Sequence, residues 1–234
     1  SWLRQLRRAR TPDHIQRRAC LQMRGFLCVL HPDDPSALLL SVSHGHDLRL
    51  LEPFATVTPI TGSRHWGWQI TSDRSMTGLF PSSLDRPRGM TGIGFRGFTG
   101  HGFESYRRMH HGARALLSPL DIGVALLVRA LPLIGVGTWW SCDGHAQGPA
   151  RVSLATRWDA VWLDLALGEL WGWAFRDDVG PACHWSVDCE GAALIITPEE
   201  AGGGARVLHD SLAIAEVLMK PQVHRALRAA RAAA

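Results

Sequence analysis

The chain has 234 residues, of which 46% are hydrophobic, and it carries a formal charge of +4 at pH 7 with a sequence pI of about 9.1. A chain of this length and apolar content can bury a substantial core, as one large domain or two small ones. Its modest positive charge is compatible with a nucleic acid, a nucleotide or another phosphate-bearing partner, and equally with plain solubility.

Cysteine usage and the longest apolar segment exclude two classes of protein. Five cysteines spread over the chain are an odd number and too sparse for a secreted disulfide scaffold, so we expect a reducing, cytoplasmic environment. The arginine-rich N-terminus lacks the apolar core of an export signal. The longest apolar run, residues 122–137, is interrupted by Arg129 and Pro132 and is shorter than the roughly 18 to 20 residues that span a bilayer. We therefore expect no membrane partner.

The first 72 residues are predicted to form a helix followed by four strands. Thr11, Pro12 and Asp13 have the order of an N-cap, a first helical residue and an acidic first turn, which predicts a helix to about Met23 that stops at Gly25. Short β-like segments follow between Pro, Gly and Asp turns, at residues 26–30, 37–42, 54–60 and 66–71. We expect them to form an antiparallel β-meander.

A glycine- and proline-rich segment, residues 73–102, separates this part from the rest. A loop of that length is typical of a lid, a binding loop or a linker. We therefore predict three regions: an N-terminal helix plus β-meander over residues 1–72, the loop or linker over 73–102, and a C-terminal α+β domain over 103–234. Helices are expected at residues 103–117 and, after Ser118 and Pro119 reset the chain, from Asp121 to near Pro132.

The C-terminal region has the clearest pattern of predicted strands and helices. Strands are predicted at residues 136–140 and 151–155, a helix at 157–173, a hairpin at 184–197, and helices at 208–220 and 221–232. This ββαββα unit predicts an α+β fold whose helices pack on an antiparallel or mixed sheet. In the helix at 157–173, Trp158, Val161, Trp162 and Leu165 recur at helical spacing and are predicted to form its buried face.

The most informative segment is TWWSCDGH, residues 138–145, which places Ser141, Cys142, Asp143 and His145 in one turn directly after an apolar strand. All four side chains can take part in chemistry. Asp-Gly also closes tight turns between strands, so the composition fits a structural loop as well. The turn is therefore a candidate site with several open uses.

Zinc binding and catalysis are two of these uses. Cys142 and His145 are suitably spaced for two zinc ligands, and Cys183 and Cys189 in the following hairpin can complete a tetrahedral shell. Cysteines that pack as small core hydrophobes are the alternative. In the catalytic interpretation Cys142 is a thiolate nucleophile, with Asp143 or His145 as its proton partner.

Ligand binding by the turn itself is a third use. Its backbone N–H groups can form a nest that holds an anion, built around Gly144, while Ser141 and His145 supply side-chain donors. A phosphate or a nucleotide fits such a nest. Arg151 lies close in sequence and can add positive charge, although it can equally be a surface arginine.

Two polar segments elsewhere are further candidates. Aromatic and basic residues interleave over residues 86–108, a mixture that suits single-stranded nucleic acid because bases stack on aromatic rings above a basic groove; the ligand candidates are Arg96, Arg107 and Arg108. A loop fixed to the core by its phenylalanines is the alternative. In the segment SHGHD, residues 43–47, we expect a polar turn, with metal binding by His44 and His46 as the alternative.

The residues Ser141-Cys142-Asp143-Gly144-His145 resemble the Ser-Ser-Cys-Ser-Gly-Arg loop of the methyltransferase family that acts third in wybutosine synthesis on tRNA. They are also similar to a Cys-x-Gly-His-Gly loop of uncharacterised bacterial and phage proteins. The first resemblance implies a ligand-binding loop made by Ser141, Cys142, Gly144 and His145, with S-adenosylmethionine and an RNA as ligands. Asp143 and His145 stand where that family has Ser and Arg, and the likeness is confined to this turn.

Two functional hypotheses follow. In the first, the chain binds or modifies a nucleic acid, either RNA or single-stranded DNA, or a nucleotide, where the Cys142 turn meets the loop at residues 86–108. In the second, it is a non-catalytic subunit of a nucleoprotein or defence-type assembly, and the turn is structural. Exposed tryptophans, among the ten of the chain, and an arginine-rich N-terminal helix then serve interfaces with other protein subunits, since both residue types are enriched at interface hot spots.

Overall fold

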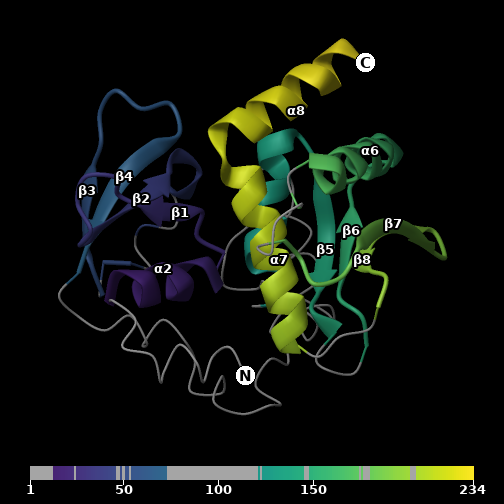
Figure 1. Cartoon of the computed structure of the whole chain (residues 1–234), viewed down its shortest axis with the longest axis horizontal. Helices are drawn as coiled ribbons and strands as arrows, with labels where there is room; N and C mark the ends of the chain where they lie inside the picture. The colour runs from purple at the N-terminus through teal and green to yellow at the C-terminus, as the bar shows by residue number, and fades with distance from the viewer. Residues whose placement is uncertain are drawn as a thin grey trace, which may run out of the picture.

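Two four-stranded antiparallel sheets and the helices between them make up the computed structural model of the chain (Figure 1). The structure describes residues 13–23, 25–45, 48, 51–52, 54–72, 121, 123–144, 148–173, 175, 180–200 and 204–234. The α+β class predicted from the sequence is confirmed. Both sheets are antiparallel, so the mixed-sheet alternative does not apply to them.

The N-terminal elements lie close to where the sequence predicts them. Helix α2 spans Asp13–Met23 and ends before Gly25, whose φ of 86° is the left-handed conformation that stops helices. The strands are β1 Cys28–Leu30, β2 Ala37–Ser41, β3 Thr56–Pro59 and β4 Trp66–Thr71, with a short 3-10 helix η1 Val42–His44 after β2.

The order of these strands differs from that of a simple meander. The sheet runs β1-β2-β4-β3, so β4 lies between β2 and β3, with Leu38 and Val57 both paired with Ile70. The connection from β2 to β3 is anchored by Leu51, which is fully buried in the N-terminal core. That anchored crossing takes β3 to the outer edge and leaves the position beside β2 for β4.

The C-terminal ββαββα unit is confirmed. Its elements are β5 Thr138–Cys142, β6 Arg151–Leu154, α6 Arg157–Trp173, β7 Trp185–Glu190, β8 Ala193–Pro198 and α7 Gly204–Met219, and the last helix is α8 Pro221–Ala233. The sheet order is β5-β6-β8-β7. The hairpin of β7 and β8 turns at Gly191, whose φ is 61°.

A short helical stretch precedes this unit. Helix α5 spans Ala125–Ala130 and continues into the 3-10 helix η5 Leu131–Ile134, which ends at Gly135 with a φ of 82°. These two elements account for the C-terminal portion of the helix predicted between Asp121 and Pro132. The predicted loop at 73–102 and helix at 103–117 lie outside the described residues. Within the described part of the chain, none of the helices combines the length and apolar character that crossing a membrane requires.

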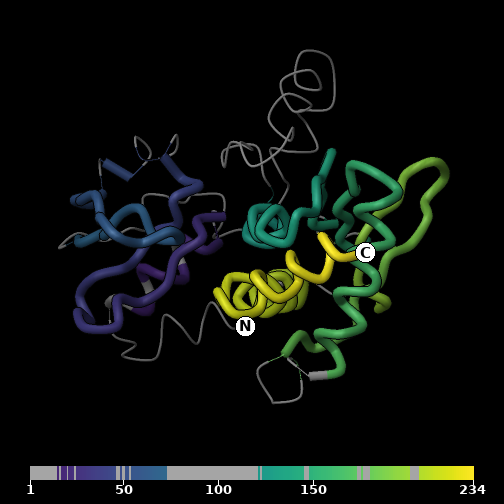
Figure 2. The backbone as a smooth tube through the Cα atoms, turned by 90° about the horizontal axis from the view of Figure 1, so that it is seen from above, coloured from purple at the N-terminus to yellow at the C-terminus, as the bar shows by residue number. Residues whose placement is uncertain are grey.

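Helices α5, α7 and α8 lie between the two sheets. Helix α6 lies beyond these three helices when seen from the N-terminal sheet (Figure 2). Met23 and Leu27 from the N-terminal part belong to the same buried cluster as α5, α6 and α7. Arg18 on α2 also forms an ion pair with Glu216 on α7, at 3.4 Å. The two parts therefore share a core across the predicted boundary.

Helix α6 presents a different face to this core than the sequence predicts. Its buried residues are Ala160, Leu163, Ala166, Leu167 and Leu170. The predicted buried stripe is instead exposed at three of its four positions, because this helix has apolar residues on nearly every side and the periodicity does not select one. Trp158 is 77% exposed, Leu165 61% and Val161 48%, and only Trp162 is partly buried against the core.

Candidate functional site

The turn at residues 141–144 lies where β5 ends, and its side chains divide between the two faces of the sheet. Ser141 pairs with Val152, which faces the helices and the main core. Cys142 pairs with Arg151 and therefore points to the opposite face, because paired residues share a face and neighbours alternate. Ser141 and Cys142 cannot act on one ligand from the same side.

Cys142 is a buried thiol. It is 5% exposed, and its Sγ accepts a hydrogen bond from the Gly144 N–H at 3.3 Å. Burial raises the pKa of Cys142 to about 11, and the charges of Asp121 and Asp143 raise it further against the lowering effect of that hydrogen bond. At neutral pH the side chain is the protonated thiol, whereas nucleophiles and metal ligands are thiolates.

The backbone N–H groups of the turn are used inside the protein. Asp143, which is buried, receives a hydrogen bond at Oδ2 from the Gly123 N–H at 3.4 Å and donates its own N–H to Asp121 Oδ2 at 3.1 Å. The Gly144 N–H is bonded to Cys142. Two N–H groups of the predicted nest, those of Asp143 and Gly144, are therefore bonded within the chain, and the nearby carboxylates of Asp121 and Asp143 repel an anion.

The described cysteines do not converge on a shared zinc position. Cys183 belongs to the main core and donates its Sγ–H to Asp210 on α7 at 3.2 Å, so it lies on the helix side of the sheet that Cys142 faces away from. Cys189 is exposed near the tip of the β7–β8 hairpin, with β6 and β8 between its strand and that of Cys142. Sulfurs on one zinc lie within about 4 Å of each other, since each Zn–S bond is about 2.3 Å. His145 lies outside the described residues, among which no group of three metal-ligating side chains occurs.

The described residues among the other predicted ligands, Arg151 and His44, both contact groups of the protein itself. Arg151 forms an ion pair with Glu190 at 2.8 Å, which occupies its charge on the protein surface. Arg96, Arg107 and Arg108 lie outside the described residues. His44 is fully buried; its Nε2 accepts the Leu27 N–H at 2.8 Å and its Nδ1 lies 3.1 Å from Arg129 Nη2, so both ring nitrogens face protein groups.

A cavity that the sequence does not reveal opens between the two parts of the molecule. We call it the basic groove. It has a volume of about 430 Å³, and it is walled on one side by residues 41–43 and 64–66 and on the other by residues of η5, α7 and α8. The positively charged side chains that line it are Arg64, Arg225 and Arg228. All three are exposed.

The arginines of the basic groove lack acidic partners in the described part of the chain. Arg225 donates its Nε–H to the Pro221 carbonyl, and no ion pair between described residues involves any of the three. By contrast Arg18, Arg151, Arg206 and Arg231 each pair with a carboxylate. No Asp or Glu is among the described residues that line the groove. Uncompensated arginines in a concave surface concentrate positive potential there.

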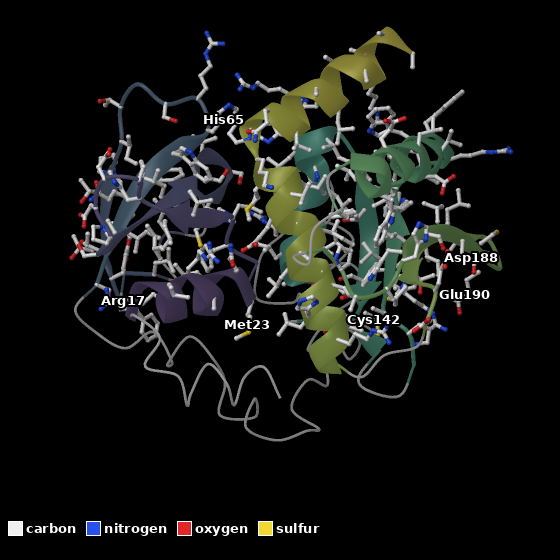
Figure 3. The ribbon with its side chains drawn as sticks, in the orientation of Figure 1. Arg17, Met23, His65, Cys142, Asp188 and Glu190 are labelled. Carbon is white, nitrogen blue, oxygen red and sulfur yellow. The ribbon has the colours of Figure 1, made fainter. Side chains whose placement is uncertain are left out.

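Two histidines, one from each wall, meet in the groove. The rings of His65 and His224 are in edge-to-face contact, with centroids 5.0 Å apart, where His65 reaches α8 (Figure 3). Burial lowers the pKa of His224, and the positive charges of His65, Arg225 and Arg228 lower it further against a hydrogen bond to the Leu218 carbonyl. The repulsion by neighbouring cations is a second sign that the groove is electropositive.

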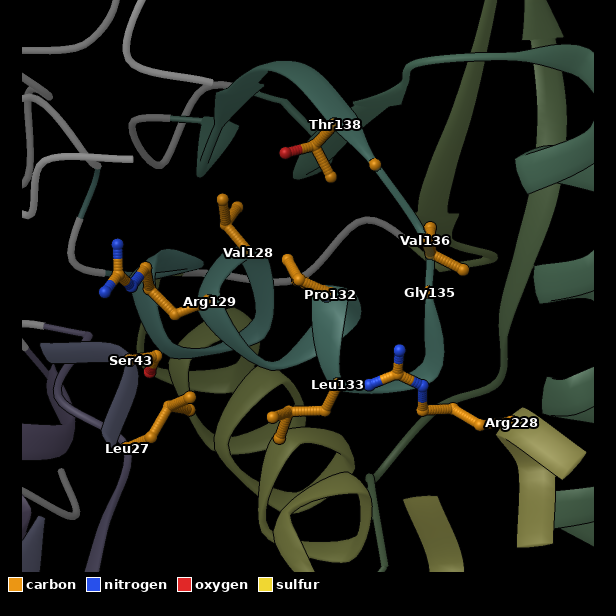
Figure 4. A pocket seen from close by; sticks show the side chains of 11 residues that line it. Leu27, Ser43, Val128, Arg129, Pro132, Leu133, Gly135, Val136, Thr138 and Arg228 are labelled. Carbon is orange, nitrogen blue, oxygen red and sulfur yellow. The ribbon is translucent and has the colours of Figure 1, made fainter. Parts of the chain in front are cut away.

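A second cavity adjoins the basic groove and shares Leu27, Ser43, Leu133 and Arg228 with it. It has a volume of about 360 Å³ and is lined mainly by apolar side chains of α5 and η5, with Arg129 and Arg228 at its margins (Figure 4). Like the groove it contains no acidic residue among the described ones. The two neighbouring cavities thus differ in character, one charged and the other largely apolar.

The basic groove escapes sequence analysis because segments that are far apart in the sequence build it. Residues 41–43, 64–66 and 219–228 carry no shared motif, and only the packing of the N-terminal sheet against α7 and α8 brings them together. One local signal exists: His224, Arg225 and Arg228 recur at helical spacing in the amphipathic helix α8.

Comparison with known proteins identifies no similar protein. No family model matches the chain, and neither a curated protein nor a solved structure is significantly similar to it.

Proposed function

We propose that this chain binds nucleic acid and holds the phosphates in the basic groove. The observation that carries the proposal is the set of three exposed arginines, Arg64, Arg225 and Arg228, in a cavity lined by no described carboxylate. Arginine is the preferred side chain for phosphate because its guanidinium donates two parallel hydrogen bonds. An anion can bind to these arginines without displacing an internal ion pair.

The surroundings of the groove favour a strand over a free phosphate. An apolar cavity lies next to the groove, and Arg228 lines both. Trp66, which is half-buried in the groove wall, offers an aromatic surface. Single-stranded nucleic acid binds by this combination of a basic track with apolar and aromatic platforms for its bases. We therefore expect single-stranded RNA or DNA to bind more tightly than a mononucleotide.

The double variant Arg64→Gln/Arg228→Gln tests the proposal, because it removes one arginine from each wall. We expect its affinity for a fluorescent single-stranded oligonucleotide to fall about tenfold, and the slope of log K against log salt to decrease by about 1.4, which corresponds to two lost phosphate contacts. Fluorescence anisotropy over a range of salt concentrations measures both quantities.

The matched control is Arg17→Gln/Arg206→Gln, which removes the same charge away from the groove. Its effect should be small. Equal losses in the two double variants would mean that binding follows net charge alone and would refute a groove site. Absence of any oligonucleotide binding by the unmodified chain would refute the proposed function itself.

Binding should tighten about three- to tenfold when the pH is lowered from 8 to 5.5. A bound phosphate favours the protonated form of His224, whose pKa is lowered in the free protein, so binding takes up a proton. The free chain should lose stability over the same interval, because its unfolded state binds more protons below the unfolded pKa of about 6.5. Substitution His224→Gln should flatten the pH dependence of binding, whereas His31→Gln should not, because His31 does not line the groove. An unchanged pH profile in His224→Gln excludes this role.

A second candidate function is that of a non-catalytic subunit, and the exposed apolar residues of α6 favour it. Modification of a bound RNA by Cys142, Asp143 and His145, with S-adenosylmethionine or zinc as cofactor, stays a prediction from the sequence. The buried thiol of Cys142 and the internal hydrogen bonds of Asp143 support a structural role for this turn instead.

A further inference from the structure

The basic groove contains two imidazoles in addition to its arginines. His65 directly precedes β4 on one wall, and His224 lies in the first turn of α8 on the other (Figure 3). Their rings are in edge-to-face contact, with centroids 5.0 Å apart. Arg64, Arg225 and Arg228 line the same groove. Groups that can exchange protons near neutral pH therefore stand beside groups that can hold a phosphate.

A backbone contact fixes the position of the hydrogen on His224. Its Nδ1–H donates to the Leu218 carbonyl oxygen at the end of α7, at 3.2 Å. A carbonyl only accepts, so in the neutral ring Nδ1 carries the hydrogen and the lone pair is on Nε2. Burial lowers the pKa of His224, and neighbouring positive charges lower it further, which favours this neutral form.

A lone pair on Nε2 does not help to bind a phosphate. Phosphate oxygens are acceptors, and the arginines of the groove already supply the donors that they need. A hydroxyl group, by contrast, can donate its proton to His224 Nε2. In RNA the 2′-hydroxyl of the ribose lies next to each phosphate, and DNA lacks it. The neutral histidine among these arginines therefore favours RNA as the ligand.

His65 is placed for a proton transfer in the opposite direction. No described residue forms a hydrogen bond with its ring nitrogens, whereas its backbone N–H donates to Ser63 Oγ and its carbonyl accepts from the Val42 N–H. The backbone is thus held while the ring stays able to exchange a proton. In its cationic form the imidazole can donate to an oxygen that leaves phosphorus.

Building on the proposed binding of nucleic acid, we infer that the basic groove cleaves single-stranded RNA, with His224 as general base and His65 as general acid. His224 Nε2 takes the proton of a 2′-hydroxyl while that oxygen forms a bond to the adjacent phosphorus. The bond from phosphorus to the 5′-oxygen of the next nucleotide breaks, and His65 gives this oxygen a proton. One product ends in a 2′,3′-cyclic phosphate and the other begins with a 5′-hydroxyl. Exchange with solvent restores both histidines, so the step consumes no co-reactant.

The arginines supply the charge that this reaction requires. Attack by the 2′-oxygen adds negative charge to the phosphoryl oxygens as the pentacoordinate state forms. Arg64, Arg225 and Arg228 can stabilise that charge, because no described carboxylate lines the groove to offset them. Binding and cleavage thus use the same arginines, whereas only cleavage requires the two histidines at neutral pH.

Two fluorescent oligonucleotides of one sequence, a single-stranded RNA and the corresponding DNA, test the inference with the full chain in the presence of EDTA. We expect both to bind and only the RNA to be cut. Mass spectrometry should identify 2′,3′-cyclic phosphate ends on the fragments. An RNA with 2′-O-methyl groups should be bound and stay intact, because its methyl ether has no proton to give.

The variants His224→Gln and His65→Gln should each lower the cleavage rate at saturating RNA at least about a hundredfold, as expected for loss of a general base or acid. Their affinity for the DNA at pH 8 should stay within about threefold of that of the unmodified chain, which shows that the groove is folded. His31→Gln is the matched control and should keep the rate, since His31 does not line the groove. A contaminating ribonuclease would be equally active in all of these preparations.

The pH dependence of the rate separates a catalytic role from a structural one. The cleavage rate should follow a bell-shaped curve, because His224 must be neutral and His65 cationic. The titratable and charged groups that act on His224 are His65, Arg225 and Arg228. The acidic limb of the curve should disappear in His224→Gln, which a merely structural histidine would not cause.

The outcomes distinguish this inference from the proposed function. RNA that is bound but not cut would overturn the inference and leave nucleic-acid binding in place. Cleavage that persists in both histidine variants, or that extends to DNA, would overturn it as well. Failure to bind either RNA or DNA would refute the proposed function, and the inference with it.

Discussion

Replacing Asp210 with alanine should lower the free energy of unfolding by about 3 to 5 kcal/mol, the range for removing one partner from a buried polar network. Asp210 is 1% exposed on α7 and binds the start of β7. It accepts the Ala182 N–H at 2.7 Å, the Cys183 N–H and Sγ–H at 3.4 and 3.2 Å, and the Trp185 Nε1–H at 3.4 Å. Without the carboxylate, the buried donors of Cys183 and Trp185 have no acceptor.

Urea unfolding monitored by circular dichroism measures this loss. Asp188→Ala is the matched control, and we expect an effect below about 0.5 kcal/mol (Figure 3). Asp188 is an exposed aspartate on β7 that, among the described residues, accepts a hydrogen bond only from the neighbouring Cys189 N–H. Asp210→Asn retains one acceptor oxygen and should lie between the two. If Asp210→Ala were as mild as the control, Asp210 would not be what fastens β7 to α7.

Gly144→Ala should destabilise the chain by about 3 kcal/mol, more than the conformational cost of a left-handed alanine alone. Gly144 has a φ of 79°, which costs an L-residue roughly 1 to 2 kcal/mol. A Cβ there would also lie 2.9 Å from the Pro149 carbonyl oxygen, a backbone atom that cannot rotate away. Overpacking of this kind typically adds 1 to 3 kcal/mol.

Gly191→Ala separates the two contributions. Gly191 has a φ of 61° in the β7–β8 turn, but a Cβ there meets no atom within 4 Å, so only the conformational cost of about 1 to 2 kcal/mol applies. Thermal unfolding of both variants under the same conditions gives the difference. Equal effects at the two positions would show that the turn after β5 can shift to accommodate a Cβ. That result would contradict a rigid structural turn there.

Most of the fold was predictable because local chemistry and packing agree in these elements. The glycines after α2 and between β7 and β8 stand at left-handed positions, and the helix at 157–173 has the bounds that its sequence predicts. The strand order in the N-terminal sheet was not predictable, since it depends on how Leu51 anchors the connection between β2 and β3. The buried face of α6 was predicted wrongly, because apolar residues surround this helix and only the packed core selects Leu163 over Val161.

The candidate site was less predictable than the fold. The residue types in the turn after β5 indicate reactive groups. Reactivity also depends on burial, however, and Cys142 is a buried thiol with a raised pKa. Strand pairing also puts Ser141 and Cys142 on opposite faces, which spacing along the chain does not express. The basic groove depends on contacts between residues far apart in sequence, such as His65 with His224.

The shared core has a consequence for the newly made chain. Helix α2 packs on α7, with Arg18 bound to Glu216, yet α7 is synthesised long after α2. At typical translation rates of 5 to 20 residues per second, α2 waits on the order of ten to forty seconds for this partner. During that interval Met23 and Leu27, which end up in the C-terminal core, have no native surface to cover them. The apolar surface that these two residues contribute therefore stays without its native cover until α7, residues 204–219, has left the ribosome.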